Sequence, residues 1–278
     1  MIRIEGLNKY YKRLHALKDI YLHVREGELF SYLGPNGAGK STTIRILTGL
    51  TRPSSGKASL NNFHIEKDRV KAKEQCGFVP QSINLDQELT VFENLNIHGA
   101  LFHLPRRKRK RRIDELLEYI GLSDRKKSLV KQLSGGMKRR VMISRALVHS
   151  PKILFLDEPT VGLDAGIRRR IWALIKKIQQ NGTTIFLTTH YIEEAEFLAQ
   201  RVAFLDEGEI VAIDAPQVLM SKLGSWAIDK IMEDELETVY FSQREDAKQY
   251  IAGQEESFTL RRVNLEDAFL SLTGKKPK

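Results

Sequence analysis

The chain has 278 residues, 41% of them hydrophobic, which is enough for one large domain with its own core and a small appendage. Its longest apolar run, Ile171 to Ile175, has five residues, whereas a membrane-spanning helix needs about 20. The first residues also lack the layout of a signal peptide. We therefore expect a globular protein that neither spans a membrane nor is exported. A single cysteine, Cys76, excludes an intramolecular disulfide and fits a reducing compartment, and we expect it to be an inert core thiol.

The positive charge of the chain is concentrated in one segment. The formal net charge is +10, and seven consecutive basic residues, Arg106 to Arg112, account for most of it. Such a run indicates one anionic contact surface more than a protein wrapped in nucleic acid. It could contact nucleic-acid phosphates or anionic lipid headgroups, or it could only solubilise the start of a helix.

The first 60 residues predict strands around one helix. Alternating segments at 2–4 and 16–24 are typical of strands at a sheet edge, and the apolar segment 29–33 predicts another strand. A helical pattern follows from Thr42 to Leu50, and Gly49 is its stop signal. Between this strand and this helix lies a glycine-rich loop with the spacing G-x-x-x-x-G-K-[ST], formed by Gly34, Pro35, Asn36, Gly37, Ala38, Gly39, Lys40, Ser41 and Thr42.

This loop predicts binding of a nucleoside triphosphate. Its glycines let backbone N–H groups turn inward and hold phosphates, while Lys40 reaches the terminal phosphates. The Ser41 hydroxyl would bind Mg²⁺. By itself, the motif indicates nucleotide binding and nothing more specific.

The middle of the chain changes from strand-like to helical. A short strand at 77–79 is stopped by Pro80, and Gln81 follows directly. Thr90 and Glu93 form a capping box at a helix start, and apolar residues at i, i+3, i+4 and i+7 from Ile113 share one helix face. We expect residues of about 85–150 to form a helical subdomain inserted between strands of the sheet.

Alternation of strand and helix resumes at residue 152 and continues to about 214. The continuous apolar segment 153–156 predicts a parallel strand buried on both faces, and Asp157 and Glu158 follow it. His190 ends the next strand, 183–189. Open parallel sheets bind ligands at the carboxyl ends of their strands. There, one carboxylate can hold Mg²⁺ and the second can deprotonate an attacking water. The alternative is a solvated acidic pair.

Charged residues lie near two of the predicted helix starts, at 134–140 and at 191–196. Ser134, Gly135 and Gly136 open a helix and predict a second anion site, because backbone N–H groups and the positive end of the dipole point outward there. The basic residues 138–140 that follow are disfavoured by the dipole, so an anion nearby would offset their cost; a solvated basic turn is the alternative. In the helix at 191–200, Glu193, Glu194 and Glu196 would lie in the first turns, where the dipole favours acidic residues.

Beyond Pro216 the pattern predicts a small α+β tail. Strands are expected near 227–231, 237–241 and 258–263, a helix at 244–251 and a last helix capped by Asn264 and Asp267. We expect two regions, 1–220 and 221–278, with the helical subdomain inside the first.

The motifs together resemble the ATP-binding cassette (ABC) ATPases over about residues 2–215. The resemblance rests on the order of the phosphate loop, Gln81, Leu133 to Gly136, Ile153 to Pro159, Gly162 to Asp164 and His190. The serine-glycine-glycine sequence distinguishes this family from other phosphate-loop proteins. The resemblance implies an α/β fold of the phosphate-loop NTPase type, with a mixed sheet core.

The resemblance also implies roles for individual residues. Lys40 would clamp the β- and γ-phosphates of ATP, Glu158 would be the general base, and His190 would contact the γ-phosphate. Tyr11 would stack on adenine, and Asp164 would communicate across a dimer. The residues of the Mg²⁺ site would be Ser41, Gln81 and Asp157. No catalytic position departs from the family pattern, so we expect an active ATPase.

In the family, two cassettes sandwich two ATP molecules head to tail. Each site then combines Lys40 of one copy with Ser134 and Gly136 of the other, so the resemblance implies a homodimer. One departure concerns Lys12, which follows Tyr11 where glycine is usual, so Tyr10 could be the stacking residue instead.

The finer resemblance is to ATPase subunits of exporters of the daunorubicin-resistance and polysaccharide-export type. It rests on the segments 190–196 and 264–274. It implies a separate transmembrane permease, contacted through the helical subdomain, and a peripheral location on the cytoplasmic face of the cell membrane. The alternative is a soluble cassette that acts on nucleic acid or ribosomes through residues 106–112, but such proteins usually carry two cassettes or a long coiled-coil insertion. A stand-alone regulatory ATPase ranks last.

Overall fold

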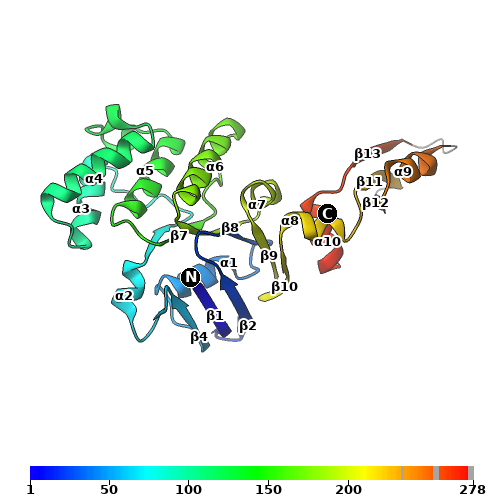
Figure 1. Ribbon diagram of the computed structural model, residues 1–278, viewed down its shortest axis with the longest axis horizontal. Helices are drawn as coiled ribbons and strands as arrows, with labels where there is room; N and C mark the ends of the chain where they lie inside the picture. The colour runs from blue at the N-terminus through cyan, green and yellow to red at the C-terminus, as the bar shows by residue number, and fades with distance from the viewer. Residues whose placement is uncertain (233–234, 253–256, 275–278) are drawn as a thin grey trace.

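The computed structural model describes residues 1–232, 235–252 and 257–274 (Figure 1). Its centre is a six-stranded sheet in the order β10-β9-β3-β8-β7-β6, in which β10 is antiparallel to β9 and the remaining neighbours are parallel. The strands are β3 (Leu29–Leu33), β6 (Cys76–Val79), β7 (Ile153–Asp157), β8 (Thr184–Thr189), β9 (Arg201–Asp206) and β10 (Glu209–Asp214). β3, β7 and β8 are fully buried, as expected for parallel strands covered on both faces.

A second, antiparallel sheet packs beside the first. Its order is β2-β1-β4-β5, and its strands are β1 (Ile2–Tyr11), β2 (Leu14–Val24), β4 (Ser55–Leu60) and β5 (Phe63–His64). The helix α1 (Lys40–Leu47) shares one hydrophobic core with both sheets, through Ile44 and Leu47. The short helix α2 (Arg69–Glu74) leads into β6. Cys76 lies in this core, where burial raises the pKa of its thiol to about 12, as expected for an unreactive cysteine.

Helices replace strands between β6 and β7, as predicted. They are α3 (Val91–Leu101), α4 (Arg106–Tyr119) and α5 (Gly135–Leu147), with two 3₁₀ turns at Ser123–Arg125 and Val130–Gln132 (Figure 1). The capping box at the start of α3 is confirmed, because the Glu93 N–H donates to Thr90 Oγ1 and the Thr90 N–H donates to Glu93 Oε2. The predicted apolar face of α4 is buried in the core that these helices share with α6 (Ala165–Gln180).

The helix α7 (Ile192–Leu198) has Glu193 and Glu194 in its first turn, as expected. Glu193 is exposed, whereas Glu194 is fully buried. Its Oε1 accepts hydrogen bonds from Thr160 Oγ1 at 2.7 Å and from Trp172 Nε1 at 2.8 Å. Burial raises the pKa of Glu194, and these hydrogen bonds oppose that shift.

The tail contains the elements that the sequence predicts. They are β11 (Trp226–Met232), β12 (Glu235–Phe241), α9 (Arg244–Ile251), β13 (Phe258–Arg262) and α10 (Leu265–Thr273), and the sheet order is β12-β11-β13. The short helix α8 (Pro216–Ser221) precedes them and was not predicted. The last helix returns to the main body, where Phe269 joins a hydrophobic cluster with Phe204 and Leu219. Residues 233–234, 253–256 and 275–278 of the expected tail lie outside the described residues. No helix of the described residues is both long and apolar enough to span a bilayer.

Candidate active site

The glycine-rich loop joins the carboxyl end of β3 to the start of α1. Gly37 and Gly39 have φ values of 86° and 108°, a region that strains other residues. A Cβ atom at Gly34 would lie 2.1 Å from the carbonyl oxygen of Leu205, and one at Gly39 would lie 2.7 Å from Leu17 Cδ2. Glycine therefore lets the loop press against β2 and β9, with the N-terminus of α1 at the carboxyl edge of the sheet, where an anion binds well.

The Lys40 side chain lies along this loop, next to the carboxylate of Glu158. Its ammonium group donates hydrogen bonds to the carbonyl oxygens of Gly34 at 2.7 Å and Pro35 at 3.0 Å. It lies 3.4 Å from Glu158 Oε1, and both side chains are buried. Burial lowers the pKa of Lys40, while the charges of Glu158 and Asp157 oppose that shift. The loop thus holds its cation near the two carboxylates at the carboxyl end of β7.

Asp157 links the loop to two neighbouring strands. Its Oδ1 accepts a hydrogen bond from Ser41 Oγ at 3.1 Å and another from Thr188 Oγ1 at 2.6 Å. Strand pairing explains this arrangement, because Asp157 lies directly opposite Thr188 in the parallel register of β7 and β8. Burial raises the pKa of Asp157, and the two hydroxyl donors oppose that shift. Thr188 was not among the residues predicted from the sequence, although its place two residues before His190 at a strand end is a usable signal.

Glu158 is the centre of the cluster. His190 Nδ1 lies 2.8 Å from Glu158 Oε2, and Gln81 Nε2 donates to the same oxygen at 3.4 Å. Glu158 has a φ of 48°, and its backbone N–H donates to the Thr188 carbonyl oxygen at 3.0 Å. Strained backbone of this kind often occurs at functional sites. The structure therefore brings together Lys40, Ser41, Gln81, Asp157, Glu158 and His190, as the sequence analysis expected.

Arg139 fixes the segment that carries Gln81, and sequence reasoning missed this role. The Arg139 side chain is buried, and its guanidinium donates to the carbonyl oxygens of Pro80 at 2.9 Å and Gln81 at 2.8 Å. Arg140 donates to the Ile120 carbonyl oxygen at 2.7 Å. A solvated basic turn is thus the wrong interpretation for Arg139, whose charge is compensated by carbonyl dipoles of the chain itself.

Ser134, Gly135 and Gly136 form a second cluster at the start of α5. Ser134 caps this helix by accepting from the Met137 N–H at 3.4 Å, and Asp164 caps α6 by accepting from the Ile167 N–H at 2.9 Å. The two helix starts touch, since a Cβ atom at Gly136 would lie 2.5 Å from Ile167 Cγ2. Ser134 and Asp164 are exposed. Within the described part of the chain, no hydrogen bond or ion pair joins this cluster to the glycine-rich loop.

The two tyrosines at the end of β1 differ in their surroundings. The Tyr10 ring stacks on His15 with 3.9 Å between ring centroids, whereas the Tyr11 ring has Lys9 Nζ at 4.9 Å. Lys12 has a φ of 53°, the conformation that glycine adopts most easily, which explains why glycine would suit this position. Tyr11 is 41% exposed, and its stacking on adenine stays a prediction.

The oxygen donors at the carboxyl edge fit a magnesium ion. Mg²⁺ prefers oxygen ligands and is usually held by one or two protein groups together with substrate phosphates. Ser41 Oγ and Asp157 Oδ1 provide a hydroxyl and a carboxylate oxygen, already adjacent and next to the loop. The Gln81 side chain reaches the same cluster through Glu158. These three residues are the ones that would hold the ion.

Comparisons with known proteins agree with this geometry. The family model described as "ABC transporter" matches residues 17–161. The linearmycin resistance ATP-binding protein LnrL of Bacillus subtilis is 43% identical over 224 residues, which cover 81% of this chain and 72% of that protein. The Nod factor export ATP-binding protein I of Cupriavidus pinatubonensis is 37% identical over 297 residues, 99% of this chain and 91% of that protein.

A solved structure shows the same fold. The dimeric post-hydrolysis state of the ATP-binding cassette MJ0796, bound to ADP and phosphate, superimposes with a TM-score of 0.70 at 32% identity. The match covers 77% of this chain and 98% of that one. With the family model, the relatives and the arrangement of loop, acids and histidine in agreement, the chain belongs to the ABC transporter family and is an ATP-binding cassette ATPase.

Proposed function

We propose that the chain is the ATP-hydrolysing subunit of an exporter and that it works as a homodimer beside a separate transmembrane permease. The observation that carries the proposal is the convergence of Lys40, Asp157 and Glu158 at one sheet edge, next to the loop that would hold the triphosphate. The names of the relatives, which refer to resistance and export, support the transport direction.

The geometry gives each residue a task in phosphoryl transfer. Lys40, already on the loop, would neutralise charge on the β- and γ-phosphates, and Mg²⁺ when bound would supply further charge neutralisation. Glu158 would accept the proton of the attacking water, and His190, 2.8 Å away, would orient that carboxylate and meet the γ-phosphate. Gln81 would sense the state of the site, because its backbone is anchored by Arg139.

A dimer would complete the site. Ser134 and Gly135 are exposed at the start of α5, and no hydrogen bond or ion pair joins them to the loop of the same chain in the part that the structure describes. A second copy arranged head to tail would bring this helix start to the γ-phosphate, and Asp164 would lie at the interface beside it. ATP binding would thus close the dimer, and hydrolysis would open it and reset the permease.

A second candidate function rests on the basic residues of α4. Four of them, Arg106, Arg107, Lys108 and Lys110, are exposed and have no ion pair among the described residues. They could contact nucleic acid, or lipid headgroups beside a permease on the cytoplasmic face of the membrane.

Co-purification from native cells distinguishes these functions. The tagged chain is recovered from nuclease-treated lysate and from membranes solubilised in mild detergent. A stoichiometric polytopic membrane protein is the expected result and supports the exporter subunit. Recovery without any membrane protein, in an association that nuclease abolishes, would contradict it and favour the nucleic-acid function.

A further inference from the structure

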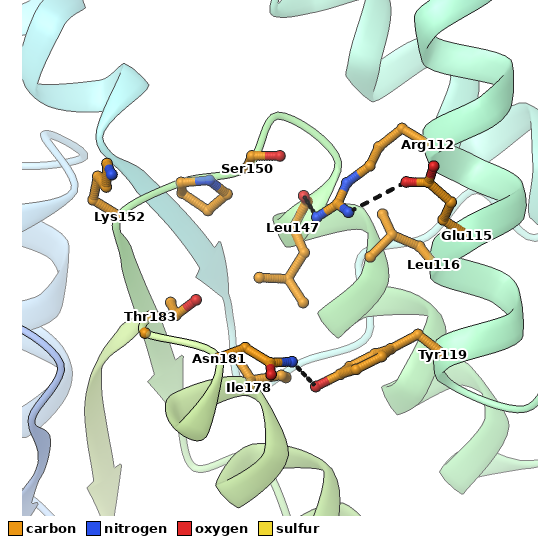
Figure 2. A pocket seen from close by; sticks show the side chains of 12 residues that line it. Arg112, Glu115, Leu116, Tyr119, Leu147, Ser150, Lys152, Ile178, Asn181 and Thr183 are labelled. Atoms are coloured by element: carbon orange, nitrogen blue, oxygen red, sulfur yellow. Dashed lines mark hydrogen bonds and ion pairs between the residues drawn. The ribbon is translucent and has the colours of Figure 1, made fainter.

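We propose that a cleft on the edge opposite the nucleotide site binds a small amphipathic organic anion. The cleft has a volume of about 430 Å³ and lies between α4, the end of α5 and the carboxyl end of α6 (Figure 2). Lys152 and Thr183, which line it, immediately precede β7 and β8, so it lies at the amino ends of these strands. None of its lining residues belongs to the nucleotide cluster, so this inference is independent of the proposed function.

Arg112 is the group that indicates an anion. Figure 2 shows its side chain extending from α4 toward the cleft. Its guanidinium has two long contacts, 3.4 Å from Nη2 to the Leu147 carbonyl oxygen and 3.6 Å from Nη1 to Glu115 Oε2. Its Nε is buried and makes no hydrogen bond within the described residues. Charge-assisted bonds of arginine are normally about 2.7–2.9 Å and often paired, so this guanidinium has unused capacity for an anionic group.

The charges around the cleft favour an anion as well. Arg112 and the exposed Lys152 are the cationic members of the lining, and Glu115 is the acidic one. Glu115 is already engaged, because its Oε1 lies 2.9 Å from Arg111 Nε on the solvent side of α4. The unpaired basic residues of the same helix add positive potential near the cleft. Ser150, which also lines the cleft, adds a hydroxyl group (Figure 2).

The floor of the cleft is apolar. Leu116, Leu147 and Ile178 are buried and form it. At one end Tyr119 closes the cleft, with its hydroxyl accepting from Asn181 Nδ2 at 3.2 Å (Figure 2). Ligand pockets typically measure about 300–1,000 Å³ and combine an apolar lining with few polar groups. A carboxylate, sulfonate or phosphate head on Arg112, with an apolar body on the leucine floor, fits both features.

The test uses 8-anilinonaphthalene-1-sulfonate, a fluorescent aromatic sulfonate, titrated into the full chain with saturating Mg·ADP to fill the nucleotide site. We expect saturable binding of one molecule per chain. Arg112→Gln should weaken it about tenfold or more, because a charge-assisted contact is lost. The matched control is Arg107→Gln, which makes the same charge change at an exposed position of the same helix. Absence of saturable binding, or equal binding by both variants, would overturn the proposal.

Two further measurements separate binding from folding effects. Thr183→Trp keeps Arg112 but fills the cleft, so it should abolish binding while the melting temperature stays close to that of the parent; retained binding contradicts the site. The uncharged analogue N-phenyl-1-naphthylamine should bind much more weakly than the sulfonate, and equal affinity contradicts an anion site. Competition with decanoate and with decyl phosphate then identifies the preferred head group, and failure of both to displace the probe contradicts the proposal.

Discussion

At the scale of single residues, Glu158 is a buried carboxylate with three polar side chains around it. Lys40, Gln81 and His190 all approach it, and its backbone is strained. If it is the general base, Glu158→Gln should keep ATP binding and lower the rate of phosphate release by about 100-fold or more. Glu193→Gln is the control, since Glu193 is an exposed glutamate on α7. A Glu158→Gln protein that hydrolyses ATP at the parental rate would contradict the assignment.

Gly136 gives a prediction about stability rather than catalysis. A Cβ atom there would lie 2.5 Å from Ile167 Cγ2, far inside van der Waals contact. Gly136→Ala should therefore lower the free energy of unfolding by about 1–3 kcal/mol, the usual cost of overpacking. At Gly166, two residues after the α6 cap Asp164, a Cβ atom would lie 3.6 Å from Asp164 Oδ1, an ordinary contact, so Gly166→Ala should be neutral or stabilising by up to about 1 kcal/mol. Urea denaturation measures both, and equal effects would show that the packing argument is wrong.

At the scale of elements, the first turn of α4 holds basic residues at the positive end of the helix dipole, where positive charge is unfavourable. Its first turn holds no acidic residue, its N-cap is Pro105 without a side-chain cap, and Arg107 is exposed. Arg107→Glu should raise the free energy of unfolding by about 0.3–1 kcal/mol at low salt, because it reverses an unfavourable charge at the positive end of the helix. The gain should shrink in 1 M salt through screening. Denaturation at both salt concentrations measures it; a loss of stability would instead indicate that Arg107 has a favourable contact.

Local sequence patterns predicted the helices and strands well, but they did not predict which side chains are buried by distant parts of the chain. The capping box at Thr90, the buried strand before Asp157 and the hydrophobic face of α4 depend on neighbours in sequence, and each is confirmed. The burial of Glu194 and Arg139 was not predicted, because it depends on partners far along the chain, Trp172 and Gln81. A helical pattern shows where a charged residue stands on a helix. It does not show whether another element lies over it.

At the scale of the whole molecule, the positions of the motifs support the proposed dimer. The β7 and β8 register brings the acids and His190 to the phosphate loop within one chain, while Ser134 is exposed and has no hydrogen bond to that loop among the described residues. In the proposed dimer, a site that uses both would be shared by two copies. Sequence order alone could not show this, because all the motifs stand in one chain.

Mixing two inactive variants tests such sharing directly. Lys40→Ala removes the loop cation and Ser134→Arg blocks the helix start, so each homodimer should be inactive. In a mixed dimer, one composite site combines the intact Lys40 of one copy with the intact Ser134 of the other. At equal amounts, half of the dimers are mixed and each keeps one of two sites, so we expect about one quarter of the parental phosphate release if the sites act independently. No recovery at any ratio would contradict a shared site, whereas activity of the Ser134→Arg protein alone would show that one chain suffices.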